Sequence, residues 1–422
     1  MINYNVNCTL TKSISKKERQ GAMLSAIICC AYCVSVLVFN IGNLMIPHLL
    51  FLLWVISLIF IDAGLVRKIF SRSYFSFFYL FLFYYFVASL AQFGIVTCVN
   101  RVIVMFELIA PMVMYEIYSA YGMKPKRMLF YTITILAIVN IYSLRQNISV
   151  EVGLKQHADE EGFMNIAYHW VYCMSILEGL ICYLLRKIWN DNFKHKTIII
   201  LCLISLAVTM AFVIVLSLYA TAIIIMLITI IMSLLYGRKK WLRKMIVSAI
   251  VAVVLFNYFL PVVINVLEKI NPESTMYAKR AIELAEMSHG EVDYYNNSGG
   301  ARLARSWISI ETFLIHPIMG LTPFTEDVVA EPPVIPGTKI GNHAEWLDDL
   351  GLYGIWAFSL FAFLWKYSKR LYKDSDIAFI FIAFIILGFL NKCFYIVHMT
   401  LLFLYAPIMY DYIMSLKKCN TR

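Results

Sequence analysis

The chain has 422 residues, of which 61% are hydrophobic and only 15% are charged. Its mean hydropathy is +0.75, whereas soluble domains carry roughly 25% charged residues, so the composition excludes an ordinary soluble domain and indicates an integral membrane protein. The net charge of +10 is explained by basic loops between membrane spans, described below, and requires no nucleic-acid partner.

The apolar runs predict an all-α polytopic membrane protein, since a spanning helix needs about 20 mainly apolar residues. The nearly uncharged stretch 197–236 is twice that length, so we expect two helices there, joined by a tight turn near 217–221. With this division the chain has about twelve spans. They are expected at 22–41, 45–65, 74–97, 102–121, 128–145, 164–185, two within 197–236, 245–266, 350–366, 376–391 and 393–414, with a break at Asn391-Lys392 between the last two.

Lysine and arginine clusters in alternate loops predict the orientation. All of them fall on the side of the basic N-terminus, at 67–72, 124–127, 186–196, 238–244, 366–373 and 417–418. The positive-inside rule therefore places both termini in the cytoplasm. The segment 267–349 has thirteen acidic residues against six basic ones, so the same rule makes it extracytoplasmic.

This outer segment is expected to be a functional region, because at about 80 residues it is much longer than a connector needs to be. The chain then divides into spans 1–9 with short loops at 1–266, an extracytoplasmic catalytic loop at 267–349 between spans 9 and 10, and spans 10–12 with a cytoplasmic C-terminus at 350–422. Apolar residues at helical spacing predict an amphipathic helix at the membrane surface, ended by Pro317 and Gly320. Its stripe consists of Leu303, Trp307, Ile310 and Leu314.

Arg302 and Arg305 are three residues apart on this helix, so their side chains are expected to project together beside the apolar stripe. Two guanidiniums at headgroup level can bind a phosphate or diphosphate bidentately. The alternative is that they neutralise lipid headgroups or pair with acidic residues of the loop itself.

His343 lies where the loop re-enters the membrane, in "GNHAEWLDDLGLYGIWAF" (341–358). Asn342 is expected to cap a helix that places His343 in its first turn. The helix dipole favours a neutral imidazole, whereas Glu345 and the aspartates at 348 and 349 favour the charged form. A neutral imidazole there could take a proton from a sugar hydroxyl as a general base; the alternative is an interfacial histidine with a purely structural role. The sequence has no zinc-ligand spacing, and we expect no metal site.

Two stretches of the outer loop resemble the O-antigen polymerase and ligase superfamily. The family pattern Ser-Gly-Arg, an aromatic residue, then His/Asn-Pro-hydrophobic-x-Gly is similar to "SGGARLARSWISIETFLIHPIMG" (298–320), with its arginine at Arg302. A second pattern, His, Leu four residues on, then Gly-hydrophobic-x-Gly, falls on His343, Leu347, Gly351 and Gly354. The gap to its first glycine is about one helical turn shorter than in ligases.

A third element of the family departs from the pattern. Ligase-like members often carry Ser-Arg-Gly at the turn between two mid-chain spans, whereas Ser217, Tyr219 and Thr221 stand at this turn. The missing arginine favours a polymerase. It leaves the second phosphate-binding arginine to be supplied by Arg305, Arg145 or Arg101.

The resemblance implies a bacterial inner-membrane glycosyltransferase that polymerises undecaprenyl-diphosphate-linked oligosaccharide repeat units on the periplasmic side. It implies inversion at the sugar, no metal and no cofactor. His343 would be the catalytic base, with Arg302 and Arg305 on the diphosphate. Membrane lipids and a chain-length regulator protein are the expected partners. Further substrate contacts are expected from Trp307, Trp346, Glu345, Tyr219 and Thr221.

Two other functions stay open at this point. One is an O-antigen ligase that transfers finished glycan to lipid A-core. The other, from a different class, is a polysaccharide flippase or exporter. A flippase should concentrate charge within its spans and needs no long outer domain, whereas this sequence does the reverse.

The orientation leads to a first prediction. In a cysteine-free background, single cysteines at Ser298 and Thr338 should react with an impermeant thiol reagent in intact cells whose outer membrane has been permeabilised, and one at Lys240 should not. The reason is that the positive-inside rule places the first two positions outside the cytoplasm. Labelling at 298 and 338 only after lysis of the inner membrane would overturn the orientation.

Overall fold

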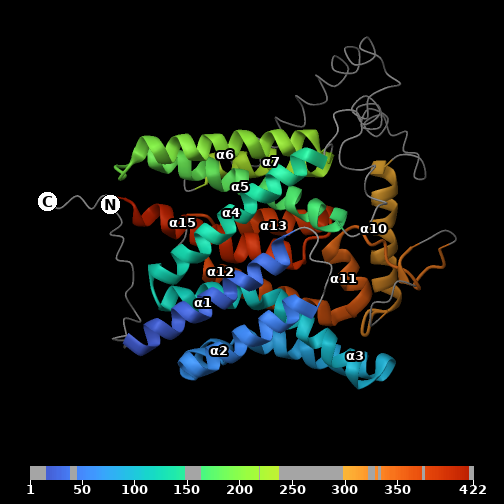
Figure 1. Cartoon of the computed structure of the whole chain (residues 1–422). Coiled ribbons are helices and arrows are strands. Elements are labelled where there is room, and N and C mark those ends of the chain that lie inside the picture. Colours follow the sequence, from blue (N-terminus) through green and yellow to red (C-terminus); the bar gives the residue numbers. More distant parts are fainter. Residues whose placement is uncertain are drawn as a thin grey trace, which may run out of the picture.

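The computed structural model describes residues 16–38, 45–147, 163–217, 219–236, 298–321, 328–330, 334–372 and 376–417 (Figure 1). Within these ranges the regular elements are helices, and β-type pairing consists of two isolated bridges. The first group of helices is α1 (Lys16–Leu37), α2 (Met45–Phe70), α3 (Phe75–Ala120), α4 (Met123–Asn147), α5 (Phe163–Asn190), α6 (Lys196–Leu216) and α7 (Ala220–Leu235). The second group is α10 (Ser298–Ile315), α11 (Glu345–Tyr353), the 3₁₀ turn η3 (Gly354–Trp356), α12 (Ala357–Leu371), α13 (Phe379–Leu390), α14 (Ile396–His398), the π-helical η4 (Met399–Tyr405) and α15 (Ala406–Ser415).

The element α3 is two helices that fold back on each other. Its backbone leaves the helical region at Gly94, where φ is 75° and ψ is 175°, a conformation that glycine adopts readily. On either side of this break, the rings of Phe78 and Phe106 lie 5.4 Å apart, although residues so distant in a straight helix would be separated by about 40 Å. The Cys98 thiol likewise donates to the carbonyl of Phe86 at 3.3 Å. The two halves correspond to the two spans expected at 74–97 and 102–121.

The all-α polytopic membrane fold is confirmed. Seven helices of the described residues are long and apolar enough to cross a membrane, and the apolar helices Thr221–Leu235 and Phe379–Leu390 are shorter. The expected division of 197–236 occurs between α6 and α7, and α13 ends at Leu390, directly before the expected break at Asn391. The expected span at 245–266 lies outside the described residues, so the total of twelve stays a prediction, as does the division into three regions.

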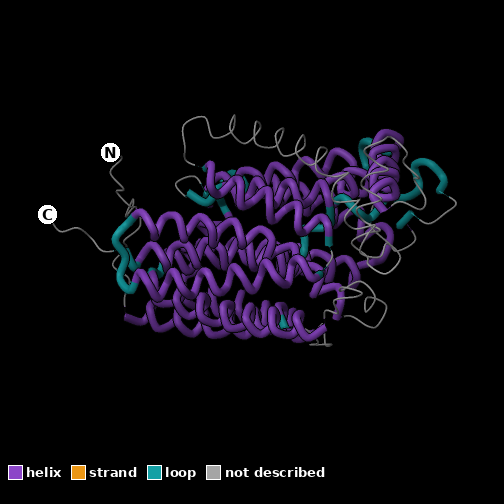
Figure 2. Tube along the Cα trace, turned by 90° about the horizontal axis from the view of Figure 1, so that it is seen from above, coloured by secondary structure: helices purple, strands orange, loops and turns teal. Residues whose placement is uncertain are grey.

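The loops that carry the basic clusters at 67–72, 124–127 and 186–196 lie at one end of the bundle, where α1 begins and α15 ends (Figure 1). Their cations pair there with acidic residues of neighbouring elements. The pairs include Lys126–Asp411 at 2.7 Å, Lys417–Asp191 at 2.8 Å, Lys187–Asp376 at 3.1 Å and Arg72–Glu116. The helices α10 and α11 lie at the opposite end. In Figure 2, α10 is seen nearly end-on, because it lies across this end of the bundle rather than along it.

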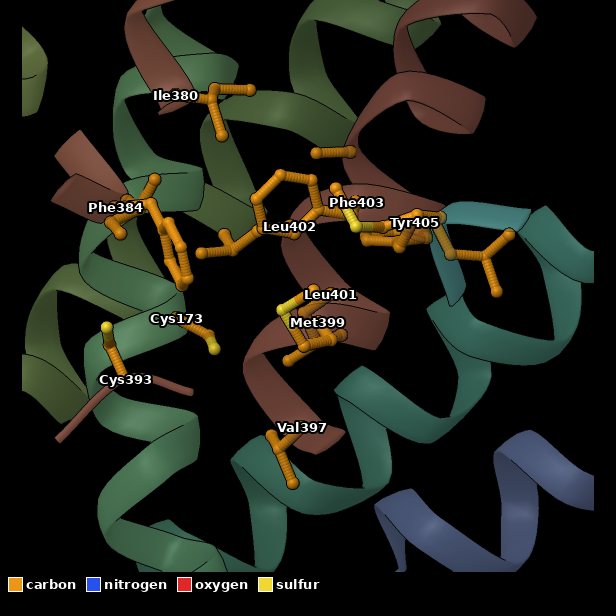
Figure 3. Close-up of a cluster of buried hydrophobic side chains, with 14 of the residues drawn as sticks. Cys173, Ile380, Phe384, Cys393, Val397, Met399, Leu401, Leu402, Phe403 and Tyr405 are labelled. Carbon is orange, nitrogen blue, oxygen red and sulfur yellow. The ribbon is translucent and has the colours of Figure 1, made fainter. Parts of the chain in front are cut away.

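The core surrounds α5, whose residues from Ala167 to Leu184 are almost all buried. A helix that is apolar on all sides requires neighbours on all sides, and α5 contacts α6, α7, α13 and α14. Figure 3 shows the part of this core around η4, where Met399, Leu401 and Phe403 lie near Cys173 of α5 and Phe384 of α13. Because α5 is held so firmly, the residues at its beginning are fixed at the end of the bundle that carries α10.

The chain enters α11 differently from the sequence-based expectation. Asn342 does not cap the helix: its φ is 56°, in the left-handed region, and Ala344 occupies the cap position before Glu345. His343 therefore precedes the helix instead of lying in its first turn. The physical reason is that the Asn342 N–H donates to the Asp348 carboxylate, which draws the backbone into this turn instead of leaving the Asn342 side chain over the helix end.

Candidate functional site

The helix α10 has one face toward the protein and one away from it. Ser309 and Thr312 are fully buried, whereas Trp307 and Leu314 are 62% and 65% exposed. The exposed pair belongs to the apolar stripe that we expected at the membrane surface. Trp307 thus lies on the opposite face of the helix from Ser309, and its expected substrate contact stays a prediction.

Arg302 reaches from α10 to the turn between α6 and α7. Its Nη1 donates to Oγ1 of Thr221 at 2.7 Å, and Thr221 is itself buried. Three tyrosines surround this contact: the ring of Tyr219 lies 5.4 Å from that of Tyr168 and 6.1 Å from that of Tyr172. Arg302 is therefore held at a fixed place, between α7 and the first turns of α5.

Asn391 joins this tyrosine group to α13. Its Oδ1 accepts a hydrogen bond from the Tyr168 hydroxyl, and its Nδ2 donates to the Tyr172 hydroxyl at 2.7 Å. Asn391 is 2% exposed, and a buried side-chain amide needs such partners. Residues that are more than 200 positions apart in the sequence are thereby tied together next to Arg302.

Arg305 contacts His343 instead of pointing with Arg302. Its Nη1 lies 3.0 Å from Nε2 of His343. A guanidinium has only donors, so Nε2 must be the acceptor, and the imidazole in this contact is the neutral tautomer with its proton on Nδ1. Arg305 is exposed and His343 is partly buried, so the contact lies at the surface of the site.

Neither guanidinium is neutralised in the described part of the chain. The ion pairs there involve other residues, and the partners of Arg302 and Arg305 are a hydroxyl and a neutral imidazole. The alternative that these arginines pair with acidic residues of the loop therefore finds no support among the described residues. Among the described residues, one of these positive charges lies beside the candidate base and the other, on the same helix, lies beside the α6–α7 turn.

The segment that carries His343 is fixed by the buried carboxylate of Asp348. Its Oδ1 accepts from the Ser309 hydroxyl at 2.5 Å and from the Asn342 N–H at 3.2 Å. Ser309 Oγ in turn accepts from the Gly341 N–H at 2.9 Å. The backbone directly before His343 is thus bound both to α10 and to α11.

Lys392 supplies the countercharge to this carboxylate. Its Nζ lies 2.9 Å from Asp348 Oδ2, and the carboxylate is fully buried. Burial alone would lower the pKa of the Lys392 ammonium, but the nearby carboxylates of Glu345 and Asp348 raise it above its usual value. Because the charge of Lys392 is already neutralised by these carboxylates, Lys392 is not available to bind a phosphate. The arginines are then the candidates for phosphate binding.

Glu345 and Trp346 have structural contacts. Glu345 Oε2 accepts from the N–H groups of Cys393 and Phe394, at 3.0 and 3.2 Å. The indole N–H of Trp346 donates to the Ile385 carbonyl at 2.8 Å, and its side chain is 4% exposed. Both residues hold α11 against α13, and nothing in the described residues tests their expected contact with substrate.

Residues 205–362 match the family model described as O-antigen ligase. This match gives the chain an O-antigen ligase-like domain at these residues and supports its similarity to the O-antigen polymerase and ligase superfamily. No curated protein matches the chain significantly. The matched region extends from α6 to α12 and contains Thr221, Arg302, Arg305 and His343.

The two superfamily patterns found in the sequence are in direct contact. Gly320, which ends the first pattern, has φ 61°, and a Cβ there would lie 2.2 Å from the Leu352 carbonyl oxygen. Gly354, which ends the second, has φ 57°, and its Cβ would lie 2.7 Å from the Pro317 and Ile318 carbonyl oxygens. Only glycine fits either position. Backbone hydrogen bonds from Leu321 to Gly351 and from Ile355 to Pro317 complete this contact.

The remaining candidates for a second phosphate-binding arginine have other neighbours. The Arg101 guanidinium lies 4.2 Å from the Phe93 ring centre, and that of Arg145 lies 5.6 Å from the Phe212 ring centre. Arg305, by contrast, is in hydrogen-bond contact with His343. The structure therefore favours Arg305 over the other two.

Sequence reasoning missed the residues that support the site, namely Ser309, Asp348, Asn391 and Lys392. Asp348 entered the sequence analysis only as a charge near His343, and Asn391 with Lys392 only as a break between spans. A signal was present for the last pair, because polar residues inside an apolar run are costly and often functional. Ser309 carried no such signal, since a serine on a helix is ordinary.

The support of His343 leads to a prediction. Ser309→Ala should lower glycan-forming activity by about tenfold or more, because it leaves the buried Gly341 N–H and one lone pair of Asp348 without a partner, at a cost of about 1–3 kcal/mol. Ser306→Ala is the matched control on the same helix, since the Ser306 hydroxyl donates only to the carbonyl of Arg302 within its own turn. Activity per folded protein is the measurement; equal activities of the two variants would contradict the supporting role.

Proposed function

We propose that the protein is a membrane glycosyltransferase that polymerises oligosaccharide repeat units linked to undecaprenyl diphosphate, on the periplasmic side of the bacterial inner membrane. The observation that carries the proposal is the contact of Arg305 with His343 at 3.0 Å, on the helix that also carries Arg302, whose guanidinium has no acidic partner among the described residues. A base for a hydroxyl and cations for a leaving diphosphate are the two groups that such a transfer needs.

The chemistry is a single displacement. The hydroxyl oxygen of the acceptor sugar attacks the anomeric carbon of the lipid-linked donor, and the bond from that carbon to the diphosphate oxygen breaks. His343 Nε2 takes the hydroxyl proton. The departing undecaprenyl diphosphate carries the negative charge that develops, which Arg302 and Arg305 stabilise. Attack from the face opposite the leaving group inverts the anomeric carbon, and the step requires neither a metal nor a nucleotide.

A polymerase is favoured over a ligase by the α6–α7 turn. Ligase-like members often carry an arginine at this turn, whereas this chain has Ser217, Tyr219 and Thr221 there, and the Thr221 hydroxyl accepts from Arg302. One arginine of the diphosphate site thus comes from α10 and is oriented by the turn. The alternative function, transfer of finished glycan to lipid A-core, uses the same groups and differs in the acceptor.

The sidedness of the site supports a donor that is already activated on a lipid. The site lies at the end of the bundle opposite to the basic clusters (Figure 1), which the positive-inside rule assigns to the cytoplasm. Nucleotide sugars are absent outside the cytoplasm, so the energy for transfer must come from the lipid diphosphate. Membrane lipids and a chain-length regulator are further partners in this proposal.

Arg302→Lys gives a prediction on the diphosphate site. Lysine keeps the charge but loses the planar, bidentate donor pair, so we expect long-chain glycan to fall by about tenfold or more. Arg186→Lys is a suitable control, because Arg186 donates to the Leu234 carbonyl at the other end of α7. Wild-type chain lengths in an Arg302→Ala strain, at matched protein level, would rule out the role in phosphate binding.

His343→Ala tests the base and the type of reaction together. General-base removal typically costs 10²–10⁴-fold, so long chains should disappear while the protein still accumulates in the membrane. Cells should then display lipid A-core capped with a single repeat unit, because assembly, flipping and ligation of one unit need no polymerase. Gel analysis of lipopolysaccharide is the measurement.

Each competing function predicts a different result for the same variant. A defective ligase would accumulate lipid-linked polymer, with neither single units nor long chains on the core. A defective flippase would trap repeat units on the cytoplasmic leaflet. A loss of only about twofold would be too small for a general base and would remove His343 from the mechanism.

A further inference from the structure

The contact between Arg305 and His343 occupies the atom that the reaction requires. A neutral imidazole has one nitrogen lone pair, and in this tautomer it is on Nε2. Arg305 Nη1 donates to that nitrogen at 3.0 Å. As long as this hydrogen bond is made, Nε2 has no lone pair with which to accept a proton from a sugar hydroxyl.

The same contact also opposes protonation of His343 electrostatically. An imidazolium would have to lie against a guanidinium at hydrogen-bond distance, and two like charges at that separation repel. No carboxylate among the described residues neutralises Arg305. The contact with Arg305 therefore blocks Nε2 of His343 and disfavours the charged form of its imidazole.

We propose that Arg305 is a donor-sensing gate on His343: the diphosphate of the lipid-linked donor draws Arg305 away from Nε2, so that the base becomes available only after the donor has bound. The inference rests on the proposed function, since it takes the diphosphate as the ligand of Arg305. It makes donor binding the first step and deprotonation of the acceptor the second.

The energetics favour this exchange. A guanidinium–diphosphate contact joins opposite charges and can be bidentate, whereas the contact with imidazole is a single hydrogen bond to a neutral acceptor. Arg305 is exposed, so its side chain can turn without disturbing buried packing. His343, by contrast, follows a backbone segment that is bound to Ser309 and Asp348, so the arginine is the partner that moves.

The two arginines then have different roles. Arg302 is bound to the buried Thr221 hydroxyl beside the tyrosine group and forms a fixed part of the diphosphate site. Arg305 moves between the base and the donor. After the exchange, the diphosphate beside His343 favours the imidazolium that forms when Nε2 accepts the hydroxyl proton, because opposite charges then adjoin.

Carbethoxylation by diethyl pyrocarbonate tests the gate, because the reagent attacks the free lone pair of a neutral imidazole. The full-length purified protein is treated with and without farnesyl diphosphate, and modification of each histidine is followed by peptide mass spectrometry. His316, which is exposed, is the internal reference. The variants are Arg305→Gln and, as a control that alters Arg302 but not Arg305, Thr221→Val.

We expect slow modification of His343 in the unliganded wild type and acceleration of about tenfold with farnesyl diphosphate, since one hydrogen bond then no longer blocks the nitrogen. Arg305→Gln should react fast in both conditions. Thr221→Val should react slowly without ligand, as the wild type does. An Arg305→Gln protein that reacts as slowly as unliganded wild type would overturn the gate, because the arginine would then not be what blocks the nitrogen.

Binding of radiolabelled farnesyl diphosphate, measured on the same samples by equilibrium dialysis, separates this inference from the proposed function. Binding with an unchanged or lower reactivity of His343 overturns the gate and leaves the diphosphate site intact. Absence of binding contradicts the diphosphate site, and with it the proposal that the donor releases Arg305 from His343. In that case the reactivity of the Arg305→Gln protein still decides whether Arg305 blocks Nε2.

Discussion

The site depends on one constraint, which is that buried backbone outside helices must find hydrogen-bond partners. Two such segments meet at the end of the bundle, one at 341–342 before α11 and one at 393–394 after α13. The carboxylates of α11 satisfy both, since Asp348 accepts from Asn342 and Glu345 accepts from Cys393 and Phe394. The acidic residues of α11 therefore accept the hydrogen bonds of the two non-helical segments, and these bonds determine the position of His343.

The helix α10 brings two arginines and a supporting serine to the segment that carries His343. One turn of it presents Arg302 to α7 and Arg305 to His343, while the opposite face carries the exposed Trp307. The buried Ser309, one turn further, joins the helix to Asp348. Because the same helix holds the base segment and carries both cations, a displacement of α10 would change the distance from cation to base only slightly, and the gate at Arg305 can work by side-chain rotation alone.

Much of the fold was predictable because membrane insertion is governed by hydropathy, which is local in the sequence. The turn before Tyr219, the break at Asn391 and the end of α10 before Pro317 all follow from local composition. The pairings in the site do not. The partners of Arg302 and Arg305 lie in segments that are 81 and 38 residues away in the sequence. The sequence predicted only that the two side chains project together, which does not indicate which arginine contacts which segment. The prediction that Asn342 caps α11 was wrong for the same reason. Capping is a local preference of the residue, whereas the conformation of Asn342 is determined by the hydrogen bond from its N–H to Asp348.

The contact at Gly320 and Gly354 gives a physical reason for the glycines of the two short patterns in this chain. Gly320 and Gly354 each lie against backbone of the other pattern, at distances that exclude any side chain. This fixes the end of α11 relative to the end of α10. The beginning of α11 is fixed separately by Asp348 and Ser309. The segment from His343 to Gly351 therefore spans two rigid attachments. His343 lies before α11, directly after the left-handed residue Asn342 and within reach of Arg305. The two attachments of α11 thus determine where the candidate base meets Arg305.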